Sequence, residues 1–268
     1  KLPKKPEYFA GIKVDGAMKR FFKILEEEKK QGKVDSSKNQ TTNLARVPAN
    51  INPKKYLQIP NSNFLIAEFE PDWTKGFDYE TSHKKVLEKG LQVPTIKTFT
   101  QYFSNVISAY QGKSKLYDSQ GAQVQGKRLE DIYKHLTTNH INNGAWSWLN
   151  SIFVKGNGFN GLDLETVTGL NSNGNLLTKK TPLEECLMED CYVTLDFNSQ
   201  GLAVKKSENQ NYKQGENIYF WHPRENYVAR FWADSDWADL YCVRDPSSWD
   251  ALLGVFSVCE ANATQRKI

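Results

Sequence analysis

The hydrophobic pattern divides the chain into a helical first part and a second part rich in short strands. Apolar residues recur at helical spacing over 16–31, 94–110 and 127–137, and a shorter, more charged helix is predicted over 82–90. From about residue 140 the chain changes to short apolar or alternating runs, namely "AWSWLNSIFV", "ECLMEDCYVTLDF", "NIYFW", "YVARFW" and "LLGVFSVC", separated by loops rich in Gly and Asn. Helices first and strands afterwards indicate an α+β fold, not repeated βαβ units.

The ends of these helices carry recognisable signals. Ser82 is the expected N-cap of the helix over 82–90, and Gly90 is its expected C′ residue. Pro94 stands near the start of the next helix. One face of that helix is expected to hold Ile96, Phe99, Phe103, Val106 and Tyr110.

Two domains are expected. Residues 1–45 combine the first predicted helix with a polar linker, "GKVDSSKNQTTN", and their role is unknown. Residues 46–268 form the main domain. The chain has no run of 18 apolar residues, and its mean hydropathy is −0.63, so no insertion into a membrane is expected.

Charge is unevenly distributed along the chain, although the net charge is only +4. Lysines are concentrated in the first half, and none occurs between Lys213 and Lys267. The segment 229–252 carries five aspartates against two arginines, which predicts a locally acidic surface. A nucleic-acid-binding protein needs a basic stripe instead, so no nucleic-acid partner is expected.

No catalytic or metal-binding constellation is recognisable. Residues 156–161, "GNGFNG", match GxGxxG, but the segment that follows lacks a helical pattern, so we interpret the match as a loop. His135 and His140 are five residues apart, not four, and we interpret all four histidines as structural or solvated. Paired carboxylates such as Asp234 and Asp236 have Trp and Ala neighbours, not the Gly turns typical of calcium loops. We therefore expect no enzyme, no metal and no cofactor.

The four cysteines have no paired CxxC spacing, which disfavours a zinc site. Four cysteines allow three complete disulfide pairings, and the sequence does not choose among them. Cys259 lies within an apolar run, so a buried thiol is the simpler expectation for it.

Residues 226–259 contain no Lys, Glu, Gln or Met. These types make up 60 of the 268 residues, so drawing none in 34 positions has a probability on the order of 2 in 10,000, before allowance for the choice of window. Codons that end in a pyrimidine cannot encode these four residues. An Asn codon, AAY, with randomised adenines yields the Asp, Ala, Ser, Tyr, Leu, Val, Phe and Arg that are seen. Trp needs TGG, so Trp232, Trp237 and Trp249 are fixed or derive from other codons. The alternative is an acidic, aromatic-rich strand surface without such a history.

Three stretches resemble the variable proteins of diversity-generating retroelements, a group that includes phage tropism determinants and has a C-type-lectin-type fold. Residues 87–106 together with 116–132 are similar to the family's helical lead-in. Residues 142–154, "NNGAWSWLNSIFV", are similar to its G-x-x-W-E-W strand motif, with Ser147 in place of the acidic residue. Residues 228–261 are similar to its C-terminal variable repeat, which closes on "LGV". The resemblance covers about residues 82–260 and implies a helical lead-in with a short-stranded C-terminal half.

The resemblance implies that a reverse transcriptase copies a template repeat with errors at adenines and that the copy replaces the end of the gene. The variable region is then about residues 229–255. The ligand-binding positions that it implies are Trp232, Asp234, Asp236, Trp237, Asp239, Tyr241, Val243, Asp245, Ser248, Trp249, Asp250, Ala251 and Leu252. Trp237 and Trp249 fit the fixed framework equally well.

The framework positions between them are Ala229, Arg230, Phe231, Ala233, Ser235, Ala238, Leu240, Cys242, Arg244, Pro246, Ser247 and Leu253 to Val258. The alternation is what a pleated strand requires, because successive residues face the core and then solvent. The variable residues are expected to form an exposed patch, anchored from beneath by the final apolar strand. Trp232, Tyr241 and Trp249 are the expected anchors, since rigid aromatic side chains carry most binding energy at such surfaces. The aspartates favour a basic partner.

The expected function is therefore non-catalytic recognition of a protein or cell-surface ligand, with the protein on a virion or a cell surface, as a monomer or an oligomer. One alternative is a fixed carbohydrate-binding lectin-like domain. Calcium-dependent lectins of related fold use Glu-Pro-Asn and Trp-Asn-Asp, whereas this chain has "HPREN" and "WAD". The other alternative is an enzyme on a fold similar to that of formylglycine-generating enzymes, although Cys242 and Cys259 give no confident match to their cysteine pair.

Overall fold

The structure is a computed structural model that describes residues 8–9, 12–13, 52–138 and 144–260. The chain divides into two units, residues 1–43 and 44–268. In the first, β1 (Tyr8–Phe9) pairs antiparallel with β2 (Ile12–Lys13). The helix predicted over 16–31 and the linker after it lie outside the described residues.

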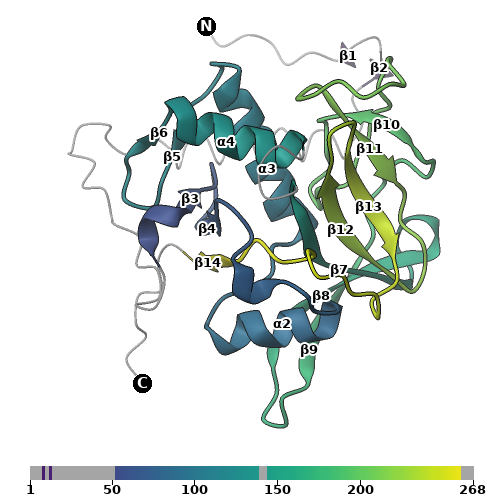
Figure 1. Cartoon of the computed structure of the whole chain (residues 1–268). Coiled ribbons are helices and arrows are strands. Elements are labelled where there is room, and N and C mark those ends of the chain that lie inside the picture. Colours follow the sequence, from purple (N-terminus) through teal and green to yellow (C-terminus); the bar gives the residue numbers. More distant parts are fainter. Residues whose placement is uncertain (1–7, 10–11, 14–51, 139–143, 261–268) are drawn as a thin grey trace, which may run out of the picture. The chain divides into compact units, whose positions relative to one another are not determined.

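A seven-stranded mixed sheet is the largest element of the second unit (Figure 1). Its strand order is β10-β11-β13-β12-β7-β8-β9, and neighbours run antiparallel except for the parallel pair β11 and β13. The strands are β7 (Trp146–Lys155), β8 (Leu162–Leu170), β9 (Leu176–Pro182), β10 (Cys191–Thr194), β11 (Asn217–Trp221), β12 (Tyr227–Ala233) and β13 (Ala238–Arg244). With the helices described next, this sheet confirms the predicted α+β class.

Two helices, α3 (Ile96–Tyr110) and α4 (Gly126–Thr137), cover one face of this sheet (Figure 1). The apolar face of α3 packs against the central strands, with the ring of Phe231 on β12 lying 4.6 Å from that of Phe99 and 5.2 Å from that of Phe103. Burial of this face confirms most of the predicted helical pattern. Tyr110 is 44% exposed and instead stacks on Tyr133 of α4 at 3.8 Å.

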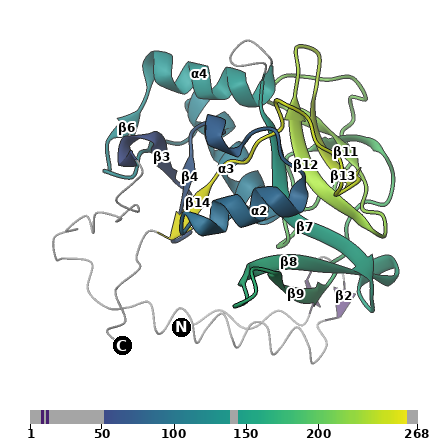
Figure 2. The same ribbon diagram turned by 60° about the horizontal axis from the view of Figure 1, so that its bottom comes forward.

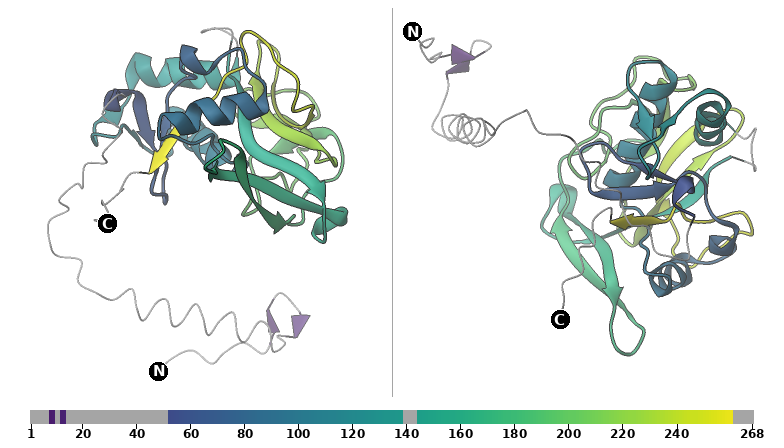
Figure 3. Two further views of the ribbon diagram at one scale, coloured as in Figure 1. Left: turned by 90° about the horizontal axis from the view of Figure 1, so that it is seen from below. Right: turned by 90° about the vertical axis from the view of Figure 1, so that its left-hand side faces the viewer.

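A smaller sheet and a third helix complete the unit. The sheet has the order β14-β4-β3, formed by β3 (Tyr56–Gln58), β4 (Phe64–Ala67) and β14 (Val258–Glu260). The helix α2 (Tyr79–Glu88) lies beside β8 and β9 (Figure 2). Figure 3 shows the β8–β9 hairpin projecting from the body of the unit.

The remaining short elements are the hairpin of β5 (Leu116–Tyr117) and β6 (Gln123–Val124) and the 3-10 helices η1 (Pro53–Lys55), η2 (Asp72–Thr74) and η3 (Phe159–Gly161). No helix within the described ranges has both the length and the apolar character needed to cross a bilayer.

Local details differ from the sequence-based expectations in two places. The N-cap of α2 is Asp78, whose carboxylate accepts from the Thr81 backbone N–H at 2.7 Å, whereas Ser82 is buried inside the helix. The apolar C-terminal run is buried, but only its last residues form a strand, β14, which pairs with β4. The predicted loop at "GNGFNG" is confirmed, because the residues after it form β8 and not a helix.

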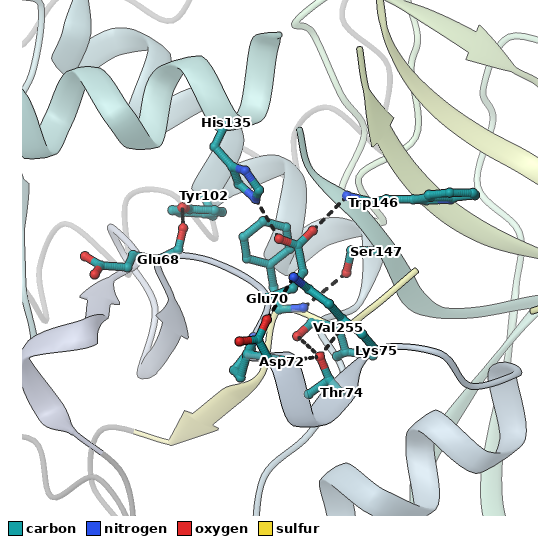
Figure 4. A network of polar contacts seen from close by, with 12 residues as sticks. Glu68, Glu70, Asp72, Thr74, Lys75, Tyr102, His135, Trp146, Ser147 and Val255 are labelled. Carbon is teal, nitrogen blue, oxygen red and sulfur yellow. Dashed lines mark hydrogen bonds and ion pairs between the residues drawn. The ribbon is translucent and has the colours of Figure 1, made fainter. Parts of the chain in front are cut away.

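A buried polar network joins the helices to the start of β7 (Figure 4). The Glu70 carboxylate lies 2.6 Å from His135 Nε2 of α4 through one oxygen and accepts the Trp146 backbone N–H at 2.9 Å through the other. Both side chains are almost fully buried, with 4% of Glu70 and 2% of His135 exposed. The network therefore fixes the first residue of β7 relative to α4.

The C-terminal run is held by a second set of contacts in the same region. The Ser147 hydroxyl accepts the Phe256 backbone N–H at 3.1 Å, and the Thr74 hydroxyl accepts that of Val255 at 3.1 Å (Figure 4). Gly254 exchanges backbone hydrogen bonds with β7, donating to the Trp146 carbonyl at 2.8 Å and accepting from the Trp148 N–H at 3.0 Å. The last residues of the predicted variable region are thus bound to the edge of β7.

Replacing Glu70 by Ala should lower the free energy of unfolding by about 3 kcal/mol, because it removes the buried carboxylate that contacts His135 Nε2 and accepts the Trp146 backbone N–H. Denaturant unfolding measures this. The matched control is Glu80→Ala, which removes an exposed pair with Lys84 at 2.7 Å and should cost less than about 0.5 kcal/mol. Equal effects of the two substitutions would show that the Glu70 contacts do not organise the fold.

Candidate ligand-binding face

The face of the large sheet that points away from α3 and α4 is called the outer face here, and five neighbouring strands supply its side chains. Along β11, Ile218 and Phe220 are in the core, so Tyr219 and Trp221 point outward. The same alternation places Tyr192 of β10 on the outer face, because Cys191 and Val193 on either side of it are in the core.

The outer face carries a series of aromatic rings, here called the aromatic row. It consists of Tyr192, Tyr219, Trp221, Tyr241, Trp232 and Trp146, taken in strand order from β10 to β7. Adjacent ring centroids lie 5.0 Å apart for Tyr192 and Tyr219, 5.1 Å for Tyr219 and Trp221, 5.2 Å for Trp221 and Tyr241, and 5.8 Å for Trp146 and Trp232. Trp237, in the turn after β12, adds a ring 5.5 Å from that of Trp232.

The guanidinium of Arg230 fills the one break in the row, between Tyr241 and Trp232. Its central carbon lies 4.5 Å from the ring centroid of Tyr241, 5.2 Å from that of Trp232 and 5.5 Å from that of Trp146. The register explains the position, because Arg230 on β12 is the direct partner of Tyr241 on β13. Three cation–π contacts thus hold a positive charge at the centre of an aromatic surface.

Asp239 lies under the row beside this cation, and here the expectation of an exposed position was wrong. It is only 5% exposed. Burial raises the pKa of its carboxyl from 3.8 to about 7, while the charge of Arg230 and hydrogen bonds from the Trp221 side chain and the Trp232 backbone act in the opposite direction. Its cross-strand partners are Tyr219 of β11 and Trp232 of β12, whose wider side chains flank the short Asp side chain, and this pairing is not visible in its own sequence neighbourhood.

The other predicted binding positions divide into three groups. Trp232, Tyr241 and Val243 are half-buried on the strands of the outer face, and Asp234, Asp236 and Trp237 lie in the turn between β12 and β13. The third group, in the loop after β13, is Asp245, Ser248, Trp249, Asp250, Ala251 and Leu252, with Trp249 the most exposed at 68%. This loop is attached to α2, because the Tyr79 backbone N–H donates to the Pro246 carbonyl at 3.2 Å.

The predicted framework positions on the two strands are buried, among them Phe231, Leu240 and Cys242. Ser235, Pro246 and Ser247, which were also assigned to the framework, are exposed in loops. Sequence reasoning missed the contributions of Tyr192, Tyr219, Trp221 and Trp146 to the outer face. The alternation in "CYVT" and "NIYFW" carries a signal for the first three, but that they share a face with β12 follows only from the strand order.

The histidines and cysteines have structural surroundings. His83 is buried, and burial lowers the pKa of its imidazole from 6.5 to about 3. His135 contacts Glu70, and His222 Nδ1 lies 2.6 Å from Asp190, whereas His140 is outside the described residues. All four cysteines are within the described ranges, buried and free of disulfides, and burial raises the thiol pKa of Cys186 to about 12 and that of Cys259 to about 11.

Asp239→Asn should become more stable than the native protein as the pH rises from 4 to 7. The folded state raises this pKa from 3.8 to about 7, so within that window it binds more protons than the unfolded state, and stability falls as the pH rises. At pH 4 the protonated acid and the amide are both neutral and similar in shape, so the two proteins should have the same melting temperature. By pH 7 the variant should be stabilised by a few kcal/mol, roughly, as measured by thermal unfolding across this range.

The control is Asp236→Asn, in the exposed turn of the same surface, which should change stability by less than about 0.5 kcal/mol at every pH. A difference between Asp239→Asn and the native protein that does not vary with pH would mean that Asp239 is ionised throughout.

Comparison with known proteins found no relative of this chain. No model of a protein family, no curated protein and no solved structure matched the chain. The interpretation of the outer face therefore depends on its own residues and geometry.

Proposed function

We propose that the protein is a non-catalytic ligand-binding protein with a C-type-lectin-type domain, whose C-terminal surface is diversified by a retroelement. Its task is recognition of a protein or cell-surface ligand, from a virion or a cell surface. The observation that carries the proposal is the absence of Lys, Glu, Gln and Met from residues 226–259. The same segment supplies β12, β13 and the loops that follow them.

The burial of this segment supports the proposal. On β13, Ala238, Leu240 and Cys242 are in the core, whereas Tyr241 and Val243 between and beyond them are half-buried on the outer face. Substitutions at the outer positions therefore change a surface and leave the packing against α3 and α4 intact. A surface that is varied from copy to copy needs this separation.

The chemistry of the outer face suits protein recognition. Trp and Tyr present large, rigid contact areas with little entropy to lose on binding, and Ser and Asp in the adjoining loops supply adaptable hydrogen-bonding groups. The exposed aspartates around the row favour a ligand with basic groups at its periphery and accelerate association at low salt.

A second candidate function, carbohydrate binding by a fixed surface, is favoured by the aromatic row. Sugar rings present apolar faces that pack on aromatic side chains, and Trp221, Tyr241 and Trp232 form such a platform. This candidate needs no retroelement, so the history of the gene distinguishes the two.

Cysteine-based catalysis on this fold has less support. Cys242 is fully buried in the main core, and burial raises its thiol pKa well above the usual value of 9.0. The reactive species of a catalytic cysteine is the thiolate, which such an environment disfavours.

The end of the gene should have a near-copy close by, with mismatches confined to adenines of that copy. Sequencing the last 120 or so bases and the next few kilobases measures this directly. The mismatched codons should fall at outer-face and loop positions such as Trp232, Tyr241 and Asp236. A unique gene end in a complete genome that lacks a reverse transcriptase would overturn diversification and leave a fixed binding surface.

Neighbouring positions of β13 should differ sharply in their tolerance to substitution. Leu240→Ala removes a fully buried side chain and should cost about 3 kcal/mol of unfolding free energy. Tyr241→Ala, on the outer face, should cost about 1 kcal/mol. Denaturant unfolding of both variants tests the pair, and an equal loss would place Tyr241 in the core and contradict a variable role for it.

A further inference from the structure

Arg230 carries a buried positive charge to which no carboxylate of the described residues is hydrogen-bonded. It is 5% exposed, and its Nε and Nη1 atoms have no hydrogen-bond partner among the described residues. No ion pair links it to Asp239, although the charge of that carboxylate acts on it. Removing a guanidinium from water without acceptors for its N–H groups destabilises a fold, so this arrangement is not explained by stability.

The surroundings of Arg230 also contain more unused donors than acceptors. Trp146 Nε1 and Arg244 Nε are buried and lack partners among the described residues, as do the two Arg230 nitrogens. Against these four nitrogens stands one buried acceptor of this site that lacks a partner among the described residues, Asp239 Oδ1. The missing partner of this site is therefore rich in acceptors.

We propose that Arg230 is the fixed anchor of the outer face and binds a carboxylate group of a protein ligand, side-chain or C-terminal, flanked by the rings of Trp232, Tyr241 and Trp146. The inference rests on the proposed binding role of this face and adds the chemistry of the ligand. The two oxygens of a carboxylate can accept hydrogen bonds from two N–H groups of one guanidinium at the same time. Arg230 belongs to the predicted framework, so every variant of the surface would keep this contact while the rings around it change.

The acidic groups nearby restrict which carboxylates fit. Asp239 and Asp250 both attract the Arg230 charge, whereas Arg244 repels it. A ligand with many acidic groups would be repelled by these aspartates, so the fitting ligand presents one carboxylate within a neutral or basic segment. Trp232 and Tyr241 are half-buried side chains that contact the guanidinium, so binding requires a rotamer change in one of them, a common adjustment at interfaces.

The first test uses two small probes of nearly equal shape, phenylacetate and phenylacetamide, titrated into the full chain. Trp146, Trp232 and Trp237 lie in or beside the site, so tryptophan fluorescence reports binding. Phenylacetate is expected to bind with a dissociation constant of about 1–10 mM and at least 10-fold more tightly than the amide. Equal binding of the two probes, or binding of neither, overturns the carboxylate site.

The second test replaces Arg230 by Met, which keeps an unbranched apolar stem and removes the buried charge. Phenylacetate binding should fall at least 10-fold, while the melting temperature stays the same or rises, since replacing a buried charge by an apolar side chain is often stabilising. Arg224→Met, which removes an exposed arginine paired with Asp190 at 2.7 Å, is the matched control and should leave binding unchanged. Arg230→Lys keeps the charge without the planar fork and should bind phenylacetate less tightly than the native protein.

A lower melting temperature of Arg230→Met would show that the guanidinium supports the fold and would overturn the anchor role. So would unchanged phenylacetate binding by that variant. Peptides of neutral or basic sequence then identify the source of the carboxylate. Comparing a free with an amidated C-terminus tests the C-terminal carboxylate, and comparing peptides with and without one Glu tests a side-chain carboxylate. These results are independent of the gene end: a diversified gene with no carboxylate preference overturns the anchor alone, and carboxylate binding by a unique gene product overturns diversification alone.

Discussion

The position of the outer face depends on one buried carboxylate. Glu70 uses both of its oxygens, one toward His135 of α4 and one toward the backbone N–H of Trp146, the first residue of β7 (Figure 4). A buried carboxylate with both oxygens occupied has little freedom to move, so it locks the register between the helical layer and the sheet. Because Glu70 fixes the backbone of Trp146, it also positions the Trp146 indole on the outer face, where this ring forms the β7 end of the aromatic row.

The sheet then separates the side chains that stabilise the fold from those proposed to contact a ligand. Its inner face is packed against α3 through large rings such as Phe231, and close packing makes substitutions there costly. Its outer face is formed by the alternate residues of the same strands, which touch solvent and one another. The chain beyond the loop is retained by backbone hydrogen bonds to β7 and by the hydroxyls of Thr74 and Ser147, contacts that leave the loop's own side chains unconstrained.

Periodicity alone predicted the elements that depend on local pattern, and it failed where long-range partners decide. The face of α3 and the alternation of β13 from Leu240 to Val243 follow directly from the spacing of apolar residues, whereas β12 buries four consecutive residues around a bulge after Val228. The C-terminal run from Leu253 has the composition of a strand, yet it lies at the edge of β7 before β14 begins, because β8 pairs only with the later part of β7. Asp239 was misplaced for a related reason: rings from other strands cover it, and only the register brings them there.

Arg230 and Asp239 are the positions at which local rules and the observed structure disagree most. Both lie on the outer face of adjacent strands, both are buried, and neither is in an ion pair with the other. Apolar residues of similar size would pack beneath the aromatic row without unused hydrogen-bonding groups, so stability alone does not select this pair. Departures of this kind concentrate where a surface has a function, since an unsatisfied group is kept when a partner satisfies it. Arg230 and Asp239, beneath the rings, are thus the part of the outer face whose chemistry is most specific, and the rings are the part best able to vary.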